Sequence, residues 1–169
     1  MTQNIYVLDS YSSDKTKEIA IKNNAKFLQN SWSGYSDQIN FGLKNFLDVY
    51  EWVLRIDADE ILSKDLANEI RVTLNYIDSE FTAISIPRRI SFLGQKIRFG
   101  GIFPMHVVRL VKPKFSICEQ RIMDEHILTS GKVFYLKNEL LDDNLVLESD
   151  INNLLEIWGS DYGDLISYG

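Results

Sequence analysis

Cysteine is almost absent from this sequence, and long apolar runs are absent altogether. The one cysteine, Cys118, excludes an internal disulfide and a zinc site built from several thiolates, so a small buried side chain is its expected role. No apolar stretch approaches the ~20 residues of a membrane-spanning helix. The polar amino terminus, residues 1–4, has no secretory pattern. We therefore expect a cytoplasmic protein.

Charge of one sign is missing from two long stretches. No Asp or Glu occurs between Thr82 and Cys118, and no Lys or Arg occurs after Lys137. We name residues 82–118 the basic segment; its cations are Arg88, Arg89, Lys96, Arg98, Arg109, Lys112 and Lys114. In a chain of net charge −6, such a segment suggests a local anionic partner, whereas the alternative is a set of solvated strand faces. The negative net charge argues against nucleic-acid binding, which needs a basic footprint.

Length and composition predict one soluble domain of the α/β class. The 169 residues are 45% hydrophobic and 25% charged, enough to bury a core. In the first half, predicted strands at 5–8, 26–28 and 52–56 alternate with predicted helices at about 14–23, 35–47 and 63–77. Later segments predict strands at 83–86, 107–112 and 133–136, a hairpin over 88–98 that turns at Gly94, and a helix over 150–158. The alternation favours a mixed, mainly parallel sheet flanked by helices.

Acidic side chains follow two of the predicted strands at the point where each strand ends. Asp9 ends the first strand, and Asp57 and Asp59 follow the strand at 52–56. Ligands bind beyond the carboxyl ends of strands in α/β folds, and two carboxylates one residue apart suit Mg²⁺ or Mn²⁺. A solvated acidic turn is the alternative for this pair. A third polar group, residues 124–126, lies beyond the basic segment.

Four segments resemble, in order, motifs of family 2 glycosyltransferases with the GT-A fold. They are LDSYSSDKT (8–16), SGYSDQINFGL (33–43), RIDADE (55–60), which is similar to the DxD motif, and CEQRIMDEHI (118–127). Residues 88–112 look like the segment that joins the last two. The fourth segment resembles bacterial enzymes that build lipopolysaccharide and capsular polysaccharide. The ordered set is far more specific than DxD alone.

The resemblance implies that the first half of the chain binds a nucleotide. Asp9 would contact the base, usually uracil, although it could instead cap the turn that follows it. Asp57 would hold the ribose or a water in the outer shell of a metal. Asp59 would bind a divalent metal, Mn²⁺ or Mg²⁺, on the diphosphate. Ser10, Gln38 and Asn40 are also placed in the nucleotide site. For Gln38 and Asn40, the alternative is ordinary polarity on a helix surface.

The implied catalytic residues lie in the fourth segment. Glu125, with Asp124 as second choice, would take the proton from the acceptor hydroxyl, although both could be surface acids at a strand end. His126 would be a metal ligand or a phosphate contact, with a structural histidine as the alternative. The resemblance thus implies a nucleotide-binding part at 1–81, an acceptor and catalytic part at 82–149, and a carboxyl-terminal helix and tail at 150–169.

The activity implied is inverting, metal-dependent transfer of a sugar from a nucleotide sugar, with UDP as the expected nucleotide. The acceptor would be a surface glycan or its lipid-linked precursor. A non-catalytic remnant or nucleotide-sugar-binding module with the same fold is the alternative. A fragment of a longer active enzyme is a third reading.

The resemblance also implies that the family's first strand is missing. Family members carry an earlier strand, with a P-x-Y/F-N turn, before the strand that here begins near Ile5. The loss would leave unpaired strand edges, so we expect a homodimer, a partner strand or low stability. Cations on the predicted hairpin suggest peripheral contact with the inner face of the membrane or with a lipid-linked acceptor. They are Arg88, Arg89, Lys96 and Arg98.

Overall fold

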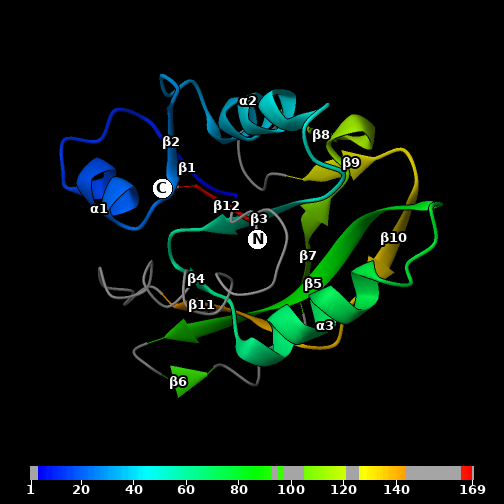
Figure 1. The fold of residues 1–169 in the computed structure, drawn as a ribbon. Coiled ribbons are helices and arrows are strands. Elements are labelled where there is room, and N and C mark those ends of the chain that lie inside the picture. The colour runs from blue at the N-terminus through cyan, green and yellow to red at the C-terminus, as the bar shows by residue number, and fades with distance from the viewer. Residues whose placement is uncertain (1–3, 93–94, 97–104, 121–125, 144–164, 169) are drawn as a thin grey trace.

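The computed structural model describes residues 4–92, 95–96, 105–120, 126–143 and 165–168. These residues form a ten-stranded mixed sheet and three helices, α1 (Thr16–Lys22), α2 (Tyr35–Phe46) and α3 (Lys64–Leu74) (Figure 1). Helices α2 and α3 lie on opposite sides of the sheet (Figure 1). The predicted α/β class is therefore confirmed.

The sheet has a parallel half and a half with both parallel and antiparallel pairs. Across it the strands are β2 (Lys26–Gln29), β1 (Ile5–Asp9), β12 (Leu165–Tyr168), β3 (Val53–Asp57), β7 (Met105–Val111), β5 (Phe81–Phe92), β11 (Leu140–Asp143) and β4 (Glu60–Ile61). Strands β2, β1, β12 and β3 run parallel, whereas β7 is antiparallel to both β3 and β5. The parallel half therefore brings several strand carboxyl ends to one edge.

Five further elements complete the described part of the chain. Strands β6 (Gln95–Lys96) and β10 (Lys132–Tyr135) pair with β5. A 3-10 helix, η1 (Pro113–Phe115), leads into a separate two-stranded sheet of β8 (Ser116–Cys118) and β9 (Ile127–Thr129). The antiparallel pairing of β5 with β6 confirms the predicted hairpin, whereas the helix predicted over 150–158 lies outside the described residues.

Local chemistry explains where the two longer helices begin. The Ser63 hydroxyl accepts a hydrogen bond from the Leu66 backbone N–H at 3.1 Å and so caps α3. Residue Gly34 precedes α2 with φ of +133°, a conformation that favours glycine. Apolar residues recur along each helix and are buried, among them Ile39 and Leu43 in α2.

The core lies on both faces of the sheet because strand side chains alternate. On one face, Val7 belongs to the cluster that contains Leu66 and Ile70 of α3. On the other face, Leu8 and its partners pack with Phe46 of α2. Cys118 is 1% exposed in a third cluster beside α2, which confirms its predicted role as a small buried side chain.

Strand β12 fills the place where the sequence predicted a gap. It lies between β1 and β3 and pairs parallel with both, so that Leu8 and Asp57 are the register partners of Tyr168. The expectation that unpaired edges would remain in this part of the sheet is therefore wrong. With it goes the reason for expecting a homodimer through that edge. The sequence pattern did not predict a strand at residues 165–168.

No helix in the described part of the chain has the length and apolarity needed to cross a membrane.

Candidate functional site

The parallel half of the sheet places its polar strand ends together. Asp9 ends β1 and Asp57 ends β3, and β12 runs between them in parallel register. Two sequence-predicted acids, from strands almost fifty residues apart, therefore share one sheet edge. Ligands of α/β folds bind at such an edge.

Asp9 is 1% exposed and is held by donors from its own loop. The Ser12 backbone N–H donates to both carboxylate oxygens, at 3.1 and 3.3 Å, and the Ser12 hydroxyl donates to Oδ1. Gln29 Nε2 lies 3.3 Å from Asp9 Oδ2. Burial alone would raise the pKa of Asp9, but the hydrogen bonds from Ser12, Gln29 and Tyr11 outweigh it and lower that pKa. This geometry matches the turn-capping alternative, and contact with a base stays a prediction.

A hydrogen-bond chain links the loop after β1 to α2. Gln38 Nε2 donates to Ser10 Oγ at 3.0 Å, and Asn30 Nδ2 donates to Gln38 Oε1 at 2.8 Å. The structure thus brings Ser10 and Gln38 together beside Asp9. Asn40 instead pairs with the backbone of Cys118, so its amide already has protein partners. The nucleotide roles of all three remain predictions.

Asp57 forms ion pairs with two arginines from different strands. Arg55 lies 2.7 Å from Asp57 Oδ1, and Arg109 of β7 lies 2.8 Å from Oδ2. Arg109 also donates to Glu60 Oε1, from Nε at 3.1 Å. Glu60 in turn accepts from the Asp57 backbone N–H at 3.0 Å. These contacts hold the Asp57 side chain and the backbone of the turn that carries the DxD sequence. The solvated-turn alternative therefore does not describe it.

Glu60 is the most buried acid of this turn, with 1% of its surface exposed. Burial raises the pKa of its carboxyl, and the charge of Asp57 adds to that, while Arg109 opposes both. A buried carboxylate needs such a partner because an unpaired buried charge is strongly unfavourable. Glu60 therefore has a structural reason to be paired with Arg109.

Asp59 lies in the same turn but differs from its neighbours. Among the described residues, no side chain donates a hydrogen bond to it. Burial raises the pKa of Asp59, and the negative charge of Asp142 is the next cause in the same direction. Asp142 in β11 faces Glu60 across the antiparallel β4–β11 pair, one residue from Asp59. Two acids thus approach each other at this end of the site.

The residues present fit a divalent cation only in part. No cluster of three or more His, Cys, Asp or Glu side chains able to hold a metal occurs among the described residues. Two carboxylates, those of Asp59 and Asp142, could take part in binding a cation, and Asp142 Oδ1 is buried with no hydrogen-bond partner in the described part of the chain. Mg²⁺ and Mn²⁺ are commonly held by one or two carboxylates together with substrate phosphates. The donor set therefore fits a cation that a bound diphosphate helps to hold.

The predicted base lies where the structure gives no description. Glu125 and Asp124 fall within residues 121–125, outside the described part of the chain. Their neighbour His126 is exposed, and its backbone oxygen accepts from the Glu119 N–H at 2.9 Å. All three roles therefore stay predictions.

The cations of the basic segment whose side chains the structure describes pair with acids from outside that segment. Arg88 pairs with Asp142, Arg89 with Glu139, and Arg109 with Asp57 and Glu60. Lys96 has no described side chain, and Arg98 lies outside the described residues. Arg88 and Arg89 are thus partly buried and paired with carboxylates, and contact of the hairpin cations with a membrane or a lipid-linked acceptor stays a prediction.

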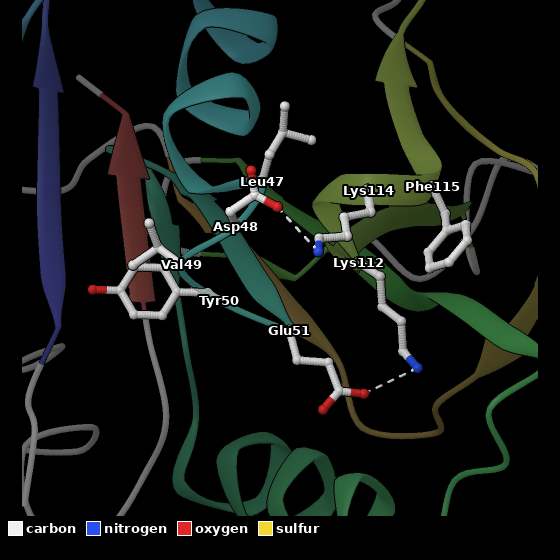
Figure 2. A pocket seen from close by; sticks show the side chains of 8 residues that line it. All are labelled: Leu47, Asp48, Val49, Tyr50, Glu51, Lys112, Lys114 and Phe115. Carbon is white, nitrogen blue, oxygen red and sulfur yellow. Dashed lines mark ion pairs between the residues drawn. The ribbon is translucent and has the colours of Figure 1, made fainter.

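Two lysines of the same segment line a pocket at the opposite end of β3 (Figure 2). Lys112 pairs with Glu51 at 3.1 Å, and Lys114 pairs with Asp48 at 3.0 Å, as the dashed lines in Figure 2 mark. Glu51 precedes the amino end of β3, whereas Asp57 ends that strand. This pocket is therefore separate from the site at the carboxyl edge.

Three residues of the site were missed by reasoning on the sequence. Glu60, Arg109 and Asp142 carry the buried ion pairs; Glu60 lies in the RIDADE segment and Arg109 in the segment 88–112, but neither was assigned a role in the site. A signal existed for Arg109, since a lone cation inside the apolar run of residues 107–111 needs a buried partner. Asp142 had no comparable signal, because its strand is only four residues long and half polar.

The fold and the site together define a class of protein. A mixed α/β sheet with helices around it, and carboxylates at the carboxyl ends of parallel strands, has the arrangement of a GT-A-like domain. The model of "Glycosyl transferase family 2" matches residues 2–144, and the chain belongs to that family. The resemblance read from the sequence is thereby confirmed.

Relatives in several Rickettsia species bear names of the same kind. A protein of Rickettsia typhi is 34% identical over 119 residues, which is 69% of this chain and 39% of that protein. A protein of Rickettsia conorii is 47% identical over 70 residues, 41% of this chain and 24% of the relative. Both are named uncharacterized glycosyltransferases. The chain thus spans less than half the length of the curated relatives it matches.

Proposed function

We propose that this chain takes part in metal-dependent, inverting transfer of a sugar from a UDP-sugar to a hydroxyl of a surface glycan or lipid-linked acceptor. The observation that carries the proposal is the sheet edge where Asp9, Asp57 and Asp59 meet. Membership of glycosyl transferase family 2 supports sugar transfer in general. The nucleotide, the acceptor and the stereochemistry are the finer parts of the proposal.

The described residues suggest a division of labour at this edge. The loop of Asp9, tied to Ser10 and Gln38, would receive the nucleoside, since its carboxylate and amide groups match the polar edge of a base. Asp57, fixed by Arg55 and Arg109, would hold the ribose. Asp59 would hold the divalent cation, which when bound neutralises the charge that grows on the leaving diphosphate.

Transfer also needs a group that takes the proton from the acceptor hydroxyl. Glu125, with Asp124 as the second choice, is proposed for this role. A single carboxylate placed opposite the leaving group produces inversion by one displacement, as in inverting glycosidases.

Calorimetry with UDP, with and without MnCl₂, tests the binding half of the proposal. We expect UDP binding that strengthens with Mn²⁺, and Asp59→Ala should abolish this Mn²⁺ dependence while leaving the melting temperature unchanged. Parent protein that binds no UDP under either condition contradicts the proposal.

Transfer assays with Glu125→Gln test the catalytic half. The amide keeps the shape of the carboxyl group but cannot accept the proton, so turnover should be lost and UDP affinity kept. If Glu125→Gln stays active and Asp124→Asn does not, the role passes to Asp124. A parent chain that binds UDP without turnover favours the nucleotide-sugar-binding module.

A further inference from the structure

Seven ionisable side chains form one cluster beneath the DxD turn, which we name the acid–arginine cluster. Its members are Asp57, Asp59, Glu60, Asp142, Arg55, Arg88 and Arg109. Four carboxylates thus face three guanidinium groups among the described residues. The arginines hydrogen-bond or pair with three of the carboxylates, and Asp59 is the one left over. The cluster therefore contains one carboxyl group more than it has arginines.

Pairing between two strands brings the backbone of Asp142 next to that of Asp59. Strand β11 runs antiparallel to β4, with Asp142 opposite Glu60 and Leu141 opposite Ile61. Asp59 immediately precedes Glu60, so the Asp142 and Asp59 backbones are neighbours across this pair. The electrostatic effect of Asp142 on Asp59 is consistent with that closeness.

The two oxygens of Asp142 are in different situations. Oδ2 accepts a hydrogen bond from Arg88 Nη2, and Arg88 Nε also lies 3.8 Å from Glu60 Oε1. Oδ1 is buried and has no hydrogen-bond partner among the described residues. A buried carboxylate oxygen without a donor is costly, and such an orphan in a polar cluster points to a missing positive ligand.

We propose that Asp142 joins Asp59 as a second carboxylate ligand of the divalent cation, with Oδ1 directed to the ion and Oδ2 anchored by Arg88. The inference rests on the metal dependence in the proposed function. The two carboxylates would supply two ligands to Mg²⁺ or Mn²⁺, and the donor diphosphate and water would supply the others. The bound ion would also add positive charge beside the unpaired carboxyl group of the acid–arginine cluster.

The test measures Mn²⁺ uptake rather than turnover. Electron paramagnetic resonance of free Mn²⁺ gives the affinity of the parent and of Asp142→Asn, each with and without saturating UDP. Replacing a carboxylate that binds the ion should weaken Mn²⁺ by at least about tenfold, since even partners outside the ligand shell are worth that much. UDP affinity without metal should not change.

Two further variants guard against a purely structural effect. Arg88→Gln combined with Asp142→Asn removes both partners, so that no arginine is left buried without an acid. This double variant should melt near the parent temperature and show the same loss of Mn²⁺. Glu139→Gln is the matched control, because Glu139 also pairs with an arginine of β5 but is not part of the acid–arginine cluster. It should bind Mn²⁺ as the parent does.

A double-mutant cycle with Asp59→Asn completes the design. If both carboxylates hold one ion, the losses in Mn²⁺ affinity should be coupled rather than additive. Unchanged Mn²⁺ affinity in both Asp142 variants overturns the inference, and so does a parent chain that takes up no Mn²⁺ either alone or with UDP. Metal-free UDP titration reports separately on the proposed function, because UDP can bind when the metal site does not exist.

Discussion

Asn40 and Cys118 are joined by two hydrogen bonds that run in opposite directions. Asn40 Nδ2 donates to the Cys118 carbonyl at 2.9 Å, and Asn40 Oδ1 accepts from the Cys118 N–H at 2.8 Å. The amide side chain thus acts as a strand partner for β8 and ties it to α2. The segment that leads to the predicted base is thereby fixed to the helix beside the nucleotide edge.

Asn40→Ala should lower the free energy of unfolding by about 1–3 kcal/mol, because both Cys118 backbone groups lose their partner. Denaturant unfolding measures this. Asn45→Ala is the control, since exposed Asn45 only bonds to the Phe41 carbonyl within its own helix. Metal-free UDP titration of Asn40→Ala checks the predicted nucleotide role of Asn40. If folded Asn40→Ala binds UDP with the affinity of the parent, that role is contradicted.

Glu60→Leu should destabilise the fold by about 3–5 kcal/mol, because Arg109 then loses its most buried partner. The double variant Glu60→Leu, Arg109→Met removes both charges and should recover part of that loss. If holding Asp57 is the task of this pair, the double variant should still bind UDP poorly although it folds. Normal UDP affinity in a folded double variant would assign the pair a purely structural role.

Acid unfolding should reveal the hydrogen bonds of Asp9. Its pKa in the folded state lies below the ordinary value of 3.8, so its stabilising effect is present above that value and is lost as the pH falls through the folded pKa. The difference in unfolding free energy between the parent and Asp9→Asn should therefore be constant near neutrality and shrink below about pH 4. Asp78→Asn, at an exposed position, serves as the control. A difference that grows on acidification contradicts this.

Ile166→Pro should disrupt the middle of the parallel half-sheet. Ile166 is paired with Tyr6 on one side and with Arg55 on the other. Proline lacks the backbone N–H and within sheets is found mainly in edge strands, whereas β12 is a central strand. The free energy of unfolding should therefore fall by about 3 kcal/mol or more. Thermal melting and light scattering measure it. Ile166→Val keeps the N–H and should behave like the parent; if the proline variant does as well, β12 does not contribute to the stability of the sheet.

Local patterns explain how much of the fold the sequence could predict. Short apolar runs such as residues 5–8, and recurring apolar residues such as Leu66 and Ile70, indicate strands and helices. Strands β4 and β11 are two and four residues long and half polar, so they carry no such pattern. Their existence depends on pairing with each other and with β5, which is a tertiary effect.

The site was predictable in its motif residues and not in its partners. Asp57 and Asp59 follow a recognisable strand, whereas Arg109 meets Glu60 across 49 residues of sequence. Which acid meets which arginine depends on the register of β7 against β3 and β5, with a shift between Ile84 and Ser85. Sequence spacing does not encode that register.

The position of β12 dictates the order in which the sheet can be assembled. Strands β1 and β3 are made early but do not pair with each other, because β12, more than a hundred residues further along, lies between them. Contacts this distant in sequence close slowly. Until they do, both strands present open edges to other chains, so newly made molecules should depend on chaperones more than the finished fold does.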